Sequence, residues 1–295
     1  MIKNQNQLGG ICMILSVLFF SLMDVLIKIT NEYDVGQVMF SRAIFGLIPI
    51  FFLIPRHKIK NFYKTKHKLL HFYRSFIGAI AMYAIFVGLR NLELAEVTSM
   101  AFSGPIWVVI FSILFLGEKI RAKRWIAVFL GFIGVLIISK PGFENLNFYY
   151  IYPIIFTLGF AGVCIFIRKL TLAWEPVYLI AFYFSVCSTI FGLFTLPFGG
   201  WLIPTFYDLG LLILIGLFGS VANLLLTKSY QLAEVSLTTP LKYLSLVFAI
   251  IFGFYFFKEI PTIYTLSGAS LIVISSAIIF IREHQLKKPI TLPRQ

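Results

Sequence analysis

The chain alternates between long apolar stretches and short polar clusters. The apolar stretches approach the roughly 20 residues that a helix needs to cross the hydrocarbon layer of a membrane. Cutting the sequence at polar clusters, Pro and Gly predicts ten such helices. Their ranges are 8–30, 36–54, 74–90, 97–116, 122–139, 149–168, 177–198, 208–227, 235–257 and 262–281. The pattern therefore predicts an all-α integral membrane protein with ten transmembrane helices.

Composition supports this interpretation. Of all residues, 59% are hydrophobic and 13% are charged, whereas soluble domains carry about 25% charged residues. The apolar run after Lys3 resembles a secretory signal, but no small-residue cleavage site follows it, so we expect a retained first span. The three cysteines are scattered through apolar segments, which argues against a disulfide framework or a zinc site. The four histidines are expected in loops or at the tail, with His67 and His71 on a wet loop face.

Basic residues predict the orientation. The loop from Arg56 to Tyr73 is rich in Lys and Arg, which places it in the cytoplasm by the positive-inside rule. Arg74, directly after this loop, is counted with its basic cluster. Alternation then puts both termini and most of the 25 Lys and Arg residues on the cytoplasmic side. The net charge of +13 thus reports topology, and we expect no nucleic-acid partner.

The sequence also contains an internal repeat. The tetrapeptide "LAEV" occurs at 94–97 and at 232–235, and "IKIT" at 27–30 is matched by "RKLT" at 168–171. Glu118 and Glu259 fall at nearly the same offset, each at the end of an apolar span. This predicts two five-helix repeats, 1–145 and 146–295. An odd number of spans forces the two copies to cross the membrane in opposite directions, as in the inverted repeats of secondary transporters.

Several segments resemble a known family. The run "FLGEKIRAKRWIAVFLGFIGVLIISKPG" resembles the fourth and fifth spans of EamA-type transporters of the drug/metabolite transporter superfamily, and "FSRAIFGLIP" is similar to their Arg-containing second span. The segment "TTPLKYLSLVFAIIFGFYFFKE" is most similar to the branch with bacterial S-adenosylmethionine and riboflavin transporters. The resemblance implies a ten-span carrier of small organic metabolites. Tyr183 stands where the repeat would place a counterpart of Arg42.

Three charges inside spans are the main candidates for substrate binding. A charged residue at mid-membrane costs roughly 2.5–3.5 kcal/mol, so it usually faces a cavity or a partner. Asp24 and Arg42 are expected at similar depth in neighbouring antiparallel helices. They either form an ion pair that fixes packing, or Arg42 receives a substrate carboxylate or phosphate while Asp24 orients it. Lys242 has no acidic partner at its depth, and Lys28 is expected to reach the interface.

Uncharged side chains add weaker candidates. Tyr243 lies beside Lys242, and aromatic residues could stack on a planar substrate, although helix packing also explains them. Asn223 and Ser103 are polar residues within spans, and interhelical hydrogen bonds also account for such groups. The aromatic candidates are Trp107, Tyr83 and Tyr183. We expect Glu118 and Glu259 to have a structural role at the membrane boundary.

These features predict a secondary active transporter in a bacterial inner membrane. The expected substrate is a small metabolite, carboxylate-bearing or zwitterionic, such as S-adenosylmethionine or an amino-acid-like compound; a riboflavin-like flavin is the alternative. No phosphate-binding P-loop motif appears, so coupling to protons or to an exchanged substrate is expected. A membrane enzyme would need a compact set of acids, bases or metal ligands. We expect no cofactor, membrane lipid as surroundings, and a monomer or homodimer.

Overall fold

In the computed structural model, the regular elements within the described residues are all helices, joined by turns and loops. The described residues are 2–101, 104–116, 148–233 and 244–260, with shorter runs at 125, 129–130, 132–134, 136–137, 238, 241–242, 262–264, 266–268, 270–271 and 274. The α-helices are α1 (Ile2–Ile29), α2 (Val35–Phe45), α3 (Leu47–Phe52), α4 (Lys68–Asn91), α5 (Leu94–Ala101), α6 (Gly104–Leu116), α8 (Ile151–Leu172), α9 (Val177–Phe194), α10 (Phe206–Leu232) and α12 (Leu244–Phe257). Two 3₁₀ helices, η1 (Arg56–Asn61) and η3 (Phe148–Tyr150), precede α4 and α8.

Six helical segments in this part of the chain are long and apolar enough to cross a membrane. They are Gln5–Ile29, Val35–Phe52, Lys68–Asn91, Phe148–Leu172, Val177–Phe194 and Phe206–Leu232. They correspond to the first, second, third, sixth, seventh and eighth predicted spans. The structure therefore confirms a multi-helix membrane protein and the approximate position of these six spans.

The remaining four predicted spans are only partly described. The fourth contains α5 and α6, and the ninth contains α12, which begins at Leu244. The fifth and tenth spans, together with Glu118, lie largely or wholly outside the described residues. The third span begins earlier than predicted, because α4 starts at Lys68.

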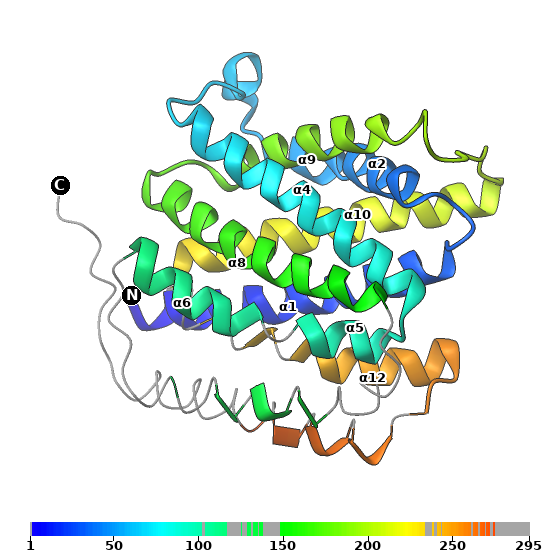
Figure 1. The fold of residues 1–295 in the computed structure, drawn as a ribbon. Coiled ribbons are helices and arrows are strands. Elements are labelled where there is room, and N and C mark those ends of the chain that lie inside the picture. The colour runs from blue at the N-terminus through cyan, green and yellow to red at the C-terminus, as the bar shows by residue number, and fades with distance from the viewer. Residues whose placement is uncertain are drawn as a thin grey trace.

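The long helices lie side by side along roughly the same axis (Figure 1). α1 packs along α10, α4 along α8, and α2 along α9. Gly9 near the start of α1 lies against Ala233 after α10, while Tyr33 after α1 donates a hydrogen bond to Asp208 at the start of α10 (2.8 Å). The two helices therefore run in opposite directions.

Contacts at helix ends also fix the direction of α4 and α8. Arg90 near the end of α4 donates a hydrogen bond to the Thr30 carbonyl after α1 (3.2 Å). Gly88 lies against Pro153 at the start of α8. Thus α4 runs in the same direction as α1, and α8 runs in the opposite direction.

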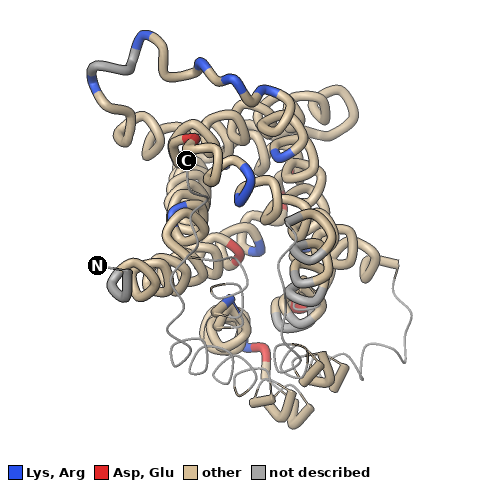
Figure 2. Tube along the Cα trace, turned by 90° about the vertical axis from the view of Figure 1, so that its left-hand side faces the viewer, with Lys and Arg blue, Asp and Glu red and all other residues tan. Residues whose placement is uncertain are grey.

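Basic residues gather at one end of this bundle. Figure 2 shows Lys and Arg along the loop that joins α3 to α4. This is the loop from which the sequence predicted the cytoplasmic side. Asp34 and Thr205, which cap the N-termini of α2 and α10, lie beyond the opposite ends of the helices.

Candidate functional site

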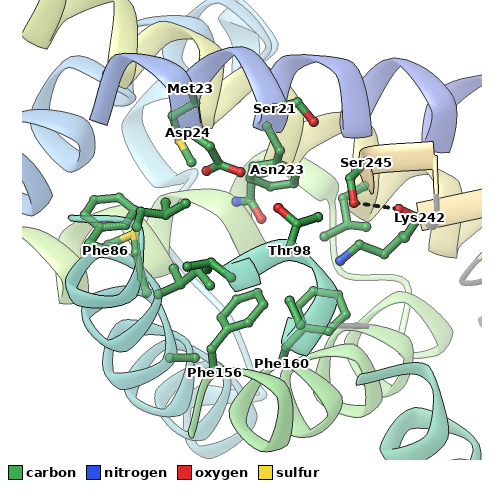
Figure 3. A pocket seen from close by; sticks show the side chains of 18 of the residues that line it. Ser21, Met23, Asp24, Phe86, Thr98, Phe156, Phe160, Asn223, Lys242 and Ser245 are labelled. Atoms are coloured by element: carbon green, nitrogen blue, oxygen red, sulfur yellow. Dashed lines mark hydrogen bonds between the residues drawn. The ribbon is translucent and has the colours of Figure 1, made fainter. Parts of the chain in front are cut away.

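A cavity of about 170 Å³ lies in the middle of the helix bundle. Residues of α1, α2, α4, α5, α8, α9, α10 and α12 line it, so both halves of the chain contribute. Four charged side chains and one buried amide face it: Asp24, Arg42, Arg74, Lys242 and Asn223. Figure 3 shows Asp24 from α1 and Lys242 from the segment before α12 projecting toward a common space, with phenylalanine rings on the opposite wall. Three of these charges were predicted from the sequence.

Arg42 is buried on α2 and has weak hydrogen-bond acceptors. Its side chain is 7% exposed. Nε and Nη1 donate to the sulfur atoms of Met23 (3.3 Å) and Met82 (2.8 Å). Nη2 lies 3.4 Å from the Gly219 carbonyl oxygen. A thioether sulfur is a weak acceptor, so the guanidinium retains capacity for a stronger one.

The possible ion pair between Asp24 and Arg42 is not formed. Within the described residues, the ion pairs at 4.0 Å or less involve Lys28 with Glu259 and His71 with Glu175. Asp24 lines the same cavity as Arg42. Of the two alternatives drawn from the sequence, the packing ion pair is therefore wrong for this conformation.

Lys242 meets an aromatic ring. It lies in a short 3₁₀ turn just before α12, and its Nζ is 3.3 Å from the centroid of the Phe160 ring. Its carbonyl accepts a hydrogen bond from the Ser245 hydroxyl (2.8 Å). A cation over an aromatic face is stabilised by the ring quadrupole. The neighbouring candidate Tyr243 lies outside the described residues.

Arg74 is the residue that sequence reasoning misplaced. It lies inside α4, is 1% exposed and lines the cavity, so counting it with the cytoplasmic loop was wrong. Its Nη2 donates a hydrogen bond to Asn223 Oδ1 (3.0 Å), and its Cζ lies 4.0 Å from the centroid of the Phe184 ring. The bond joins α4 to α10, so it is an interhelical hydrogen bond of the kind expected for Asn223 as the alternative to substrate binding.

The helical periodicity of the sequence around Arg74 could have revealed that this residue lies inside a helix. His71, Arg74, Ser75 and Gly78 recur at spacings of three and four residues, and all are buried on one face of α4. The intervening apolar side chains, such as Phe72, are exposed. This is the pattern of a helix with one face toward the protein interior. The pattern begins before residue 74, where the third span was predicted to start, because α4 begins at Lys68.

Other predicted binding residues lie away from the cavity. Tyr83 packs on Phe191 and lines a separate pocket beside Asp34. Tyr183 donates its hydroxyl to the Tyr63 carbonyl (2.6 Å), near the α3–α4 loop. Trp107 on α6 is partly exposed and contacts the Phe111 ring of its own helix. Ser103 lies outside the described residues.

Contacts between ionisable side chains lie at both ends of the bundle. At one end Lys28 Nζ is 2.5 Å from Glu259 Oε1, so Lys28 is paired and does not simply reach the interface. At the other end His71 Nε2 is 3.6 Å from Glu175 Oε2, and Thr65 donates a hydrogen bond to Glu175 (2.5 Å). His71 is fully buried, which corrects its expected place on a wet loop.

Comparisons with known proteins agree on a transporter family. A sequence model of the EamA-like transporter family matches residues 7–140 and 147–281. An S-adenosylmethionine uptake transporter of Rickettsia bellii is 30% identical over 66% of this chain and 67% of its own. The pseudopaline exporter CntI of Pseudomonas aeruginosa is 27% identical over 93% and 96%. A riboflavin transporter of Rhizobium johnstonii is 27% identical over 68% and 66%.

A solved structure has the same fold. A crystal structure of a protein that is 14% identical superimposes with a TM-score of 0.73, covering 95% of this chain and 99% of that one. At this level of identity the similarity concerns the fold alone.

Proposed function

The chain belongs to the EamA-like transporter family, and from this we propose that it is a secondary active transporter that works by alternating access. The observation that carries the proposal is the central cavity, which both halves of the chain line and which holds Asp24, Arg42 and Lys242. Charged side chains inside a membrane protein are costly and commonly mark a substrate path. The substrate is a small organic metabolite.

The helix arrangement supports two inverted five-helix repeats. The repeat matches α1 with α8 and α4 with α10, and the packing of α1 on α10 then corresponds to that of α8 on α4. The contacts of α2 with α10 and of α4 with α9 correspond in the same way. Matched helices run in opposite directions, as α1 and α8 do. Two such halves can exchange conformations around one site, with 1–145 and 146–295 as the repeats.

The preferred substrate bears a carboxylate, as in a zwitterion of the S-adenosylmethionine or amino-acid type. Asp24 would then meet the cationic end, and Arg42 and Lys242 the anionic end. Relatives named for uptake of S-adenosylmethionine and for export of pseudopaline motivate this choice. A flavin is the second candidate, because Phe20, Phe86, Phe156, Phe160 and Phe184 line the cavity and one relative is named a riboflavin transporter.

The remaining elements of the proposal concern the membrane and the energy source. The α3–α4 loop and both termini lie in the cytoplasm, and the protein resides in a bacterial inner membrane as a monomer or homodimer. Transport is driven by a proton gradient or by exchange. The basic loop at one end of the bundle supports this orientation.

Uptake by purified protein in proteoliposomes tests the proposal. Lys242→Met and Arg42→Met should each reduce uptake of the accepted substrate about tenfold or more, because each removes a cation that lines the cavity. Lys228→Met is the matched control, since Lys228 is exposed and pairs with Gln231 on the surface. Lys28 does not serve as a control because it is paired with Glu259. Unchanged uptake in both cavity variants, with the protein folded, would show that these cations are structural.

A further inference from the structure

Two guanidinium groups lie against the same aromatic ring in the cavity. The Cζ atom of Arg74 is 4.0 Å from the centroid of Phe184, and that of Arg42 is 5.5 Å from it. They come from α4 and α2, and both side chains are buried. Among the described residues neither has a carboxylate within 4.0 Å. Two like charges are therefore held close together without a protein counter-ion in contact.

The donors of both groups are incompletely used. Arg74 Nε and Nη1 are buried and have no hydrogen-bond partner in the described structure, while Nη2 donates to Asn223. Arg42 donates to two sulfur atoms and a distant carbonyl. A buried donor without an acceptor is unfavourable, and a guanidinium binds carboxylate or phosphate oxygens in a two-pronged geometry.

The charge balance of the cavity changes once Arg74 is included. Asp24 is the one carboxylate among the described lining residues, against the cations Arg42, Arg74 and Lys242. The cavity thus has a net excess of two positive charges, one more than Asp24, Arg42 and Lys242 give without Arg74. A zwitterion or a neutral flavin leaves this excess in place, whereas a dianion offsets it.

We propose that Arg42 and Arg74 form a binding site for a doubly anionic group, supplied by two carboxylates or one phosphate ester of the substrate. Asn223 positions Arg74 by accepting its hydrogen bond. The apolar or planar part of the same molecule packs against rings of α8, Phe156 and Phe160, which line the cavity. This inference rests on the proposed transport function, and within the class of small organic metabolites it favours a dianion over the zwitterion considered above.

Pairs of compounds that differ in one acidic group test the site. The purified full-length protein is titrated with FMN and riboflavin, and with benzylsuccinate and 3-phenylpropionate, while its thermal unfolding is followed. The dianionic member of each pair should bind at least tenfold more tightly. Equal affinity within both pairs would overturn the proposal. So would an equal shift with inorganic phosphate or chloride alone, which would identify a simple anion site.

Substitution of Arg74 tests whether the preference for dianionic compounds depends on this residue. Arg74→Gln should reduce the tenfold preference to about twofold or less. Arg90→Gln is the matched control, because Arg90 lies on the same helix but contacts the Thr30 carbonyl outside the cavity. An undiminished preference in folded Arg74→Gln protein would make Arg74 a packing residue.

A second variant keeps the test decisive if Arg74→Gln does not fold. Asn223→Asp places a carboxylate where an amide oxygen now lies 3.0 Å from Arg74 Nη2. It should stabilise the free protein and abolish the preference, because Arg74 then has an internal counter-ion. Greater stability with the preference unchanged would indicate a purely structural role. Transport of zwitterions without any dianion preference would overturn this inference and leave the proposed function standing, whereas no uptake of any compound would contradict the proposed function itself.

Discussion

The position of the Arg42 guanidinium depends on a missing side chain across the helix interface. Gly219 on α10 faces Arg42, and a Cβ added there would lie 2.7 Å from Arg42 Nε and 2.7 Å from Met23 Sδ. Both distances are shorter than van der Waals contact, so the side chains of Arg42 and Met23 would both have to move. Gly219 therefore allows the cation to lie between α2 and α10 at the cavity wall.

Replacing Gly219 should weaken substrate binding without changing the stability of the protein. In Gly219→Ala the new methyl group displaces the flexible ends of Arg42 and Met23, so we expect KM for uptake to rise severalfold with a nearly unchanged Tm. Gly162→Ala is the control, because its nearest neighbour, Ile77 Cγ2, is at an ordinary 3.7 Å. Uptake kinetics in proteoliposomes measure the effect. An equal KM in both variants would contradict the dependence of Arg42 on Gly219.

Single residues were predictable where they interrupt an apolar run. Asp24, Arg42 and Lys242 stand alone among apolar neighbours, and all three line the cavity. Arg74 was missed because it directly follows a basic loop, so its charge looked like topology. Its burial depends on α4 starting at Lys68, and an apolar window does not locate a helix start among polar residues.

At the level of elements, α2 and α9 approach each other through glycines. A Cβ on Gly36 would lie 1.7 Å from Thr195 Oγ1, and one on Gly192 would lie 2.9 Å from the backbone oxygen of Gly36 and from the nitrogen of Phe40. Backbone atoms at that distance cannot turn aside as a side chain can. The two helices must therefore separate if a side chain is added at Gly192.

Two alanine substitutions in helices should have opposite effects on stability. Gly192→Ala forces α2 and α9 apart, and overpacking of this kind typically costs about 1–3 kcal/mol. Gly210→Ala, on α10, meets no atom within 4 Å, so it should stabilise the helix by up to about 1 kcal/mol. Thermal unfolding in detergent measures both. A Gly192→Ala protein as stable as the Gly210→Ala protein would mean that the close approach is not needed.

Six of the ten predicted spans lie close to their predicted positions, but interruptions within spans were not predicted. The second predicted span is divided at Gly46 into α2 and α3. Pro49 lies in the first turn of α3, where the missing N–H costs little, whereas in mid-helix it would remove a hydrogen bond. The ninth span was predicted as continuous, yet Leu241 and Lys242 have 3₁₀ conformation and α12 begins at Leu244. The length of an apolar run indicates that a segment can cross the membrane, but it does not indicate where helices begin and end within that segment.

Across the whole molecule, the two halves are joined by the Lys28–Glu259 ion pair at one end of the bundle and by a His71–Glu175 contact at the other. Lys28 on α1 pairs with Glu259, 231 residues later. His71 Nε2 on α4 lies 3.6 Å from Glu175 Oε2, between α8 and α9, and forms an ion pair when its imidazole is protonated. The repeat in the sequence predicted two halves, but partners so far apart could not be matched without the fold. If the cavity opens to the two sides in turn, as proposed, we expect one of these contacts to separate at each opening.

This arrangement predicts how access to the cavity responds to each ion pair. In a background without Cys12, Cys164 and Cys187, Thr98→Cys places a thiol in the cavity wall. Adding Lys28→Gln removes the charge that holds Glu259, so labelling by an impermeant maleimide added outside intact cells should increase severalfold. Adding Glu175→Gln instead weakens the opposite contact, favours opening to the cytoplasm and should lower labelling from outside.

Lys64→Cys in the α3–α4 loop is the control for orientation in the same experiment. Its thiol should remain unlabelled from outside in every background. Labelling there in sealed cells would reverse the proposed orientation. If instead Thr98→Cys responds equally to both neutralising changes, the two ion pairs do not act on opposite sides of the cavity. Opposite responses are expected because a single central cavity in an alternating-access carrier opens to one side only while the other side is closed. Each ion pair then stabilises the closed state of its own end, and neutralising it shifts the population toward opening there.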